Sequence, residues 1–139
     1  MVHVSVGSPA GTYSVGNASF FRYIVRLGDV GLDLRPIERD ALAMLAAIPD
    51  ASIDEDEISG HGWRVVPAAN MEDWPVLEVT PQRLRTALQT ARRLLWENAT
   101  PVGISAREIV AVEEELDNVL SVLARAEAAG YSVNVSYVS

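Results

Sequence analysis

The segment 105–137 restricts the fold of this chain more than any other part of the sequence. Ser105 and Glu108 have the spacing of a capping box, in which two side chains bond each other's backbone N–H at a helix start. Gly130 supplies the left-handed residue that commonly ends a helix. The sequence therefore predicts a long helix over 106–129. Its apolar stripe consists of Ile109, Val112, Leu116, Val119, Leu120 and Leu123.

An alternating stretch follows this helix directly. Tyr131, Val133, Val135 and Tyr137 alternate with small polar residues, which is the period of a strand with one buried face. The N-terminal residues 2–6 show the same alternation of valines with polar residues. We therefore expect a sheet with one apolar face, against which amphipathic helices pack.

The rest of the chain divides at its proline and glycine residues. Residues 7–17 have the composition of a loop, and Phe20 to Leu27 is interpreted as a strand that pairs with the first as a long-looped hairpin. Prolines at helix starts predict one helix from Pro36 and another from Pro81, bounded by Asn98 and Pro101. The stripe of the first of these consists of Ile37, Ala41, Met44, Leu45 and Ile48. Short strands are predicted over 63–67 and 76–79.

The predicted fold class is α+β, in one domain over residues 1–139. The expected element order is ββαββααβ. A mostly antiparallel sheet of about five short strands would be covered on one face by three amphipathic helices.

Basic residues of a single type limit the available chemistry. The chain has eleven arginines and no lysine, so Schiff-base chemistry and a phosphate-loop lysine are excluded. It has no cysteine, which excludes disulfides, thiolate metal sites and cysteine nucleophiles. A GC-rich genome explains the absence of lysine most simply, since such a genome favours arginine. Selection against lysine modification is the alternative.

The negative charge is unevenly distributed along the chain. The net charge is −8, which argues against nucleic acid or an anionic membrane as the partner. Residues 50–79 sum to −7, whereas residues 80–100 sum to +3. The N-terminus shows no signal-peptide pattern, and the apolar runs are too short to cross a bilayer, so we expect a cytoplasmic protein.

The acidic run from Asp54 to Glu57 is the first candidate site. A calcium loop needs glycine at its sixth position and glutamate at its twelfth, and neither Asp50 nor Asp54 starts such a pattern. Two interpretations remain besides an unspecified metal site. The run is either a solvated loop or a surface that docks a basic partner.

Two other segments contain residue types that could act in a site. His61 lies between two glycines and precedes Trp63, so it could act as a base, or the segment could be a turn with Trp63 in the core. Near one edge of the predicted helix from Pro81 lie Arg85, Arg92 and Trp96. They could form an interface with a partner, or the arginines could pair within the chain with acids such as Glu113 to Glu115. No nucleophile elbow, dinucleotide fingerprint or metal-ligand spacing is present.

The leading hypothesis is a small acidic, non-catalytic protein-binding module of the inhibitor or immunity-protein kind. It would dock a protein with a basic surface through its acidic loop, without a cofactor or metal. One alternative is a small-molecule-binding domain or small enzyme with a pocket between sheet and helices near His61. A second alternative is an oligomeric structural subunit that pairs through the helix 106–129. The candidate partner-binding residues are Asp54, Glu55, Asp56, Glu57, Trp63, Arg85, Arg92 and Trp96.

Overall fold

The computed structural model describes residues 3–15, 19–46, 63–66 and 76–138. The strands are β1 (His3–Ser8), β2 (Gly11–Val15), β3 (Arg64–Val66), β4 (Val76–Val79) and β5 (Val133–Val138). The helices are α1 (Ser19–Asp29), α2 (Pro36–Ala46), α4 (Pro81–Glu97), the short α5 (Ala99–Val102) and α6 (Ala106–Ala129). The predicted α+β class with an antiparallel sheet is confirmed.

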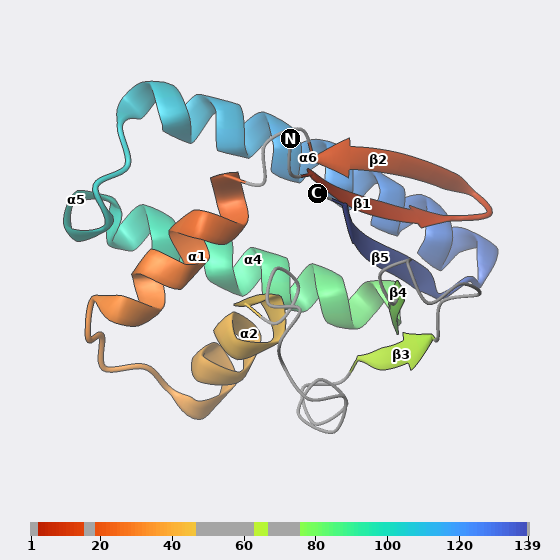
Figure 1. Cartoon of the computed structure of the whole chain (residues 1–139), viewed down its shortest axis with the longest axis horizontal. Coiled ribbons are helices and arrows are strands. Elements are labelled where there is room, and N and C mark those ends of the chain that lie inside the picture. Colours follow the sequence, from red (N-terminus) through yellow and green to blue (C-terminus); the bar gives the residue numbers. More distant parts are fainter. Residues whose placement is uncertain (1–2, 16–18, 47–62, 67–75, 139) are drawn as a thin grey trace.

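The sheet has the strand order β2-β1-β5-β4-β3, and every neighbouring pair is antiparallel. The last strand in the chain is therefore central, and it joins the β1–β2 hairpin to the β3–β4 pair (Figure 1). Val6 lies opposite Val135, which in turn lies opposite Leu77. These three side chains are buried and give the sheet its apolar face.

The prediction of a strand over Phe20 to Leu27 is wrong, because these residues lie in α1. Tyr23, Ile24 and Leu27 are buried, and their i, i+1, i+4 spacing is that of a helix face. The partner of β1 is instead β2, which is separated from β1 by two residues and occupies part of the predicted loop. A short run of apolar and β-branched residues fits both the helical period of 3.6 and the strand period of 2. Whether it forms a helix or a strand is therefore decided by the residues against which it packs.

Helix α4 is the centre of the helical layer and contacts α1, α2, α5 and α6. Figure 1 shows it crossing the molecule with α1 and α2 on one side and α6 on the other. Helix α6 contacts β1 and β2, whereas α1 and α2 pack mainly on each other and on α4. The prediction of three helices on one sheet face is thus incorrect. The structure contains further helices, α1 and α5, and both α1 and α2 pack on α4.

The ends of the two long helices follow the local sequence signals. Thr80 caps α4 and Pro81 occupies its first turn, while Ser105 and Glu108 form both bonds of the predicted capping box of α6. Gly130 ends α6 in the left-handed conformation, with φ of 76°. Val112, Leu116, Val119 and Leu123 of the α6 stripe are buried, and Ile109 and Leu120 are partly buried against the same core. Self-pairing through that stripe would therefore need α6 to leave the core.

Helix α2 buries Ala41, Met44 and Leu45 of the predicted stripe, but its buried face differs from the prediction at the start of the helix. Ile37 of that stripe is 64% exposed, and Glu38 is buried instead. Glu38 is the third residue of the helix, and its Oε1 accepts a 2.9 Å hydrogen bond from the backbone N–H of Arg35. A glutamate at this position commonly reaches back to the N-cap, and this bond together with Arg93 makes the burial of Glu38 tolerable.

Candidate functional site

The acidic run Asp54, Glu55, Asp56 and Glu57, together with His61, lies outside the described residues. Its place in the chain is nevertheless defined by its neighbours. The segment 47–62 joins the end of α2 to Trp63, and the segment 67–75 joins β3 to β4. These two ranges, called here the acidic segments, are therefore attached at opposite ends of β3, which is a short edge strand.

The acidic segments hold most of the excess negative charge. They contain seven of the nineteen acidic residues and none of the eleven arginines. The remainder of the chain has twelve acidic residues and eleven arginines, so it is nearly neutral. A field that steers a charged partner would therefore originate mainly at these segments.

Trp63 belongs to the core. Its side chain is 2% exposed, and its indole Nε1–H donates a 2.9 Å hydrogen bond to the carbonyl of Met44. Met44 lies in the last turn of α2, where carbonyls have no partner within the helix. The indole therefore caps α2 and holds together the two chain ends that flank the segment 47–62. The structure favours the core role that the sequence left open for Trp63.

The arginine edge of α4 is engaged within the chain. Arg85 forms an ion pair with Glu127 of α6. Arg92 Nη2 lies 2.5 Å from Glu113 Oε2, and Trp96 Nε1–H donates to the same carboxylate. These contacts join α4 to α6 and favour internal pairing over an open interface for Arg85, Arg92 and Trp96.

Arg93 makes a second set of contacts on the other side of α4. Its Nη2 lies 2.5 Å from Glu38 Oε2 on α2, and its Nη1 lies 3.3 Å from Glu97 Oε2. The hydrogen bond from Arg93, followed by the backbone bond from Arg35, lowers the pKa of Glu38 to about 2. The pair of Arg93 with Glu38 was not predicted from the sequence. The signal for it was glutamate two residues after Pro36, which marks the third position of a helix.

The described helices form at least two grooves. One, of about 530 Å³, lies between α2 and α4. The other, of about 400 Å³, is lined mainly by apolar residues of α1, α2 and the connection between them. Neither is lined by Trp63, which follows His61 by two residues in the sequence.

The part of the chain that the structure describes contains neither a cluster of metal ligands nor a membrane-spanning helix. Within that part, no three acidic or histidine side chains come together in a way that could hold a metal ion. None of the helices in the described ranges has the length and apolarity that crossing a membrane requires.

Comparisons with protein-family models, curated proteins and solved structures found no match to this chain.

Proposed function

We propose that this chain is a non-catalytic protein-binding module of the inhibitor or immunity-protein kind. It would dock a partner with a basic surface through the acidic segments, with Asp54, Asp56 and Glu57 as the central contacts. The observation that carries the proposal is the separation of charge. The acidic segments hold seven acids and no arginine, while the rest of the chain is nearly balanced.

Internal ion pairs strengthen this argument. Arg85, Arg92 and Arg93 are matched by carboxylates on α2, α4 and α6. These arginines therefore contribute little positive potential to the surface. An unbalanced acidic region attracts a basic partner over long range and raises the rate of association, most strongly at low ionic strength.

The attachment of the acidic segments also suits docking. The Trp63–Met44 hydrogen bond fixes the chain ends on either side of the segment 47–62 to the core. Fixing the ends of a binding loop reduces the conformational entropy that is lost when the loop binds. The acidic groups would then be presented next to the edge strand β3.

Association kinetics with a basic partner test the proposal. The partner would first be isolated from the native cell with the intact chain, and its association would then be followed by stopped flow over a range of salt concentrations. The test variant combines Asp54→Asn, Asp56→Asn and Glu57→Gln. The matched control combines Asp29→Asn, Asp33→Asn and Glu114→Gln, which are exposed acids of the described part and give the same change in charge.

We expect the test variant to associate roughly tenfold more slowly at low salt and with a shallower salt dependence. The control should change the rate much less, because its acids lie outside the acidic segments. Equal slowing by both variants would show only an effect of net charge. A test variant that associates as fast as the parent would exclude the acidic run as the docking surface.

A further inference from the structure

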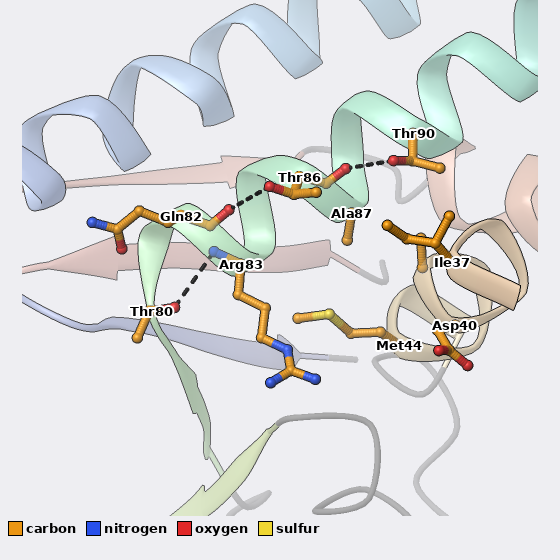
Figure 2. Close-up of a pocket in the computed structure, with 10 residues that line it drawn as sticks. Ile37, Asp40, Met44, Thr80, Gln82, Arg83, Thr86, Ala87 and Thr90 are labelled. Atoms are coloured by element: carbon orange, nitrogen blue, oxygen red, sulfur yellow. Dashed lines mark hydrogen bonds between the residues drawn. The ribbon is translucent and has the colours of Figure 1, made fainter.

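The groove between α2 and α4 contains the chemistry of a second binding site. Figure 2 shows the residues that line it, with Arg83 and Ala87 of α4 on one wall and Ile37 and Met44 of α2 on the other. Its volume of about 530 Å³ falls within the range typical of sites for small molecules. The lining residues are Ile37, Asp40, Ala41, Met44, Thr80, Gln82, Arg83, Thr86, Ala87 and Thr90.

Arg83 differs from the other arginines of α4. Arg85, Arg92 and Arg93 each form ion pairs, whereas Arg83 forms none with the described residues. Its backbone N–H donates a 3.4 Å hydrogen bond to the capping oxygen of Thr80, which fixes its backbone at the start of α4, and the residue is exposed. Figure 2 shows that side chain extending from α4 into the groove. An arginine in this position can bind a carboxylate through two parallel hydrogen bonds.

The floor beside Arg83 is apolar. Ala41, Met44 and Ala87 are buried, and Figure 2 shows the Met44 side chain extending from α2 toward Arg83. Ile37 lines the same groove and is 64% exposed, which makes it one of the large apolar side chains that the described structure leaves in solvent. A ligand could therefore cover Ile37 while its apolar group rests on Met44.

The remaining polar groups define the orientation of a ligand. The hydroxyls of Thr86 and Thr90 donate to the carbonyls of Gln82 and Thr86 at 3.0 and 2.8 Å, so toward the groove they can only accept. Asp40 adds a carboxylate on the α2 side. The groove thus offers a cationic donor at Arg83 and acceptors elsewhere along its walls.

We propose that this groove binds the C-terminal end of a peptide with an apolar last residue. The terminal carboxylate would bind Arg83, the last side chain would rest on Met44 and Ile37, and upstream N–H groups or a basic side chain would face Asp40. A C-terminal residue carries its carboxylate and its side chain on one carbon. Its carboxylate can therefore bind a cation while its side chain packs on an adjacent apolar floor. The carboxylate of an internal glutamate has no apolar side chain on the same carbon.

Short synthetic peptides test this site without the unknown protein partner. The probe is acetyl-Arg-Ala-Ala-Leu with a free carboxylate, compared with the same peptide as a C-terminal amide, and binding is measured by calorimetry or NMR titration. We expect the amide to bind roughly tenfold more weakly, because it loses a charge-assisted hydrogen bond. Arg83→Gln should lower the affinity for the acid to that for the amide.

Controls separate the groove from general electrostatics and from folding. Arg107→Gln removes an exposed arginine from α6 and should leave peptide affinity unchanged. The urea midpoint of Arg83→Gln should match that of the parent, since Arg83 is exposed. The proposal is overturned if neither peptide binds the parent at millimolar concentration, if both peptides bind equally, or if Arg107→Gln weakens binding as much as Arg83→Gln.

The site is independent of the proposed function, and the two can fail separately. The triple variant of Asp54, Asp56 and Glu57 should bind the peptide as the parent does. If the peptide bound only to that triple variant, Arg83 would be the internal partner of the acidic run. That result would overturn the proposed peptide site. The proposed docking of a basic partner would still be tested by the association kinetics described above.

Discussion

Replacement of Trp63 by phenylalanine gives the sharpest test of how this fold is held together. The indole is 2% exposed and donates to the Met44 carbonyl at 2.9 Å. Removal of the donor leaves a carbonyl in the last turn of α2 without its partner, at a cost of about 1–3 kcal/mol. The smaller ring also leaves unfilled volume in the core, which adds about 1–2 kcal/mol.

We therefore expect Trp63→Phe to lower the free energy of unfolding by about 2–5 kcal/mol. At about 4 °C per kcal/mol for a chain of this size, the melting temperature should fall by about 8–20 °C. Urea unfolding followed by far-ultraviolet circular dichroism measures the first quantity, and the slope against urea should not change. Thermal unfolding by the same signal measures the second.

Trp96→Phe is the matched control. Trp96 also donates through its indole, but to Glu113 on a partly exposed surface where water can replace the bond. This variant should lose no more than about 1 kcal/mol. A loss of less than about 0.5 kcal/mol for Trp63→Phe, or equal losses for the two variants, would refute the assignment of Trp63 as the cap of α2.

Two further predictions concern carboxyl groups whose pKa values shift in opposite directions. The bonds from Arg93 and Arg35 lower the pKa of Glu38 from 4.5 to about 2, so its contribution to stability is present above pH 4.5 and is lost as pH falls toward 2. Glu38→Gln should therefore destabilise the protein at pH 7. The urea midpoint of this variant should fall less between pH 4.5 and pH 2 than that of the parent, and an equal fall would exclude the Glu38–Arg93 pair as a source of acid sensitivity. Burial, with a smaller effect from Glu114, raises the pKa of Glu115, so the charged form is disfavoured in the folded state above that pKa. Glu115→Gln should consequently raise the urea midpoint at pH 7 and leave it unchanged at pH 3, and a lower midpoint at pH 7 would contradict this explanation.

Local signals predicted the elements whose ends carry capping residues. Thr80 with Pro81 starts α4, and Ser105 with Glu108 starts α6, at the positions that the sequence indicated. These caps act over three or four residues, so a single sequence contains all the information they need. The alternation of valines likewise predicted β5 within two residues of its observed bounds.

The segment 20–27 shows where such signals are insufficient. Its apolar residues fit a strand and a helix equally well, and contacts with α2 and α4 decide for the helix. The glycine and serine content of residues 11–15 indicated a loop, but pairing with β1 makes this segment a strand. In both cases the energy that decides comes from residues far along the chain.

For the candidate site, the sequence alone determined which charges exist and where they concentrate. It located the acidic segments and the four arginines of α4, because composition is a property of the chain. Only the tertiary structure decided which charges meet. It pairs Arg85, Arg92 and Arg93 with carboxylates, leaves Arg83 beside Met44 in a groove, and inserts the last strand into the centre of the sheet. The physical reason is that ion pairing and strand order depend on how whole elements pack against one another. The energy of that packing comes from contacts between residues far apart in the chain, and a local sequence pattern does not contain those contacts.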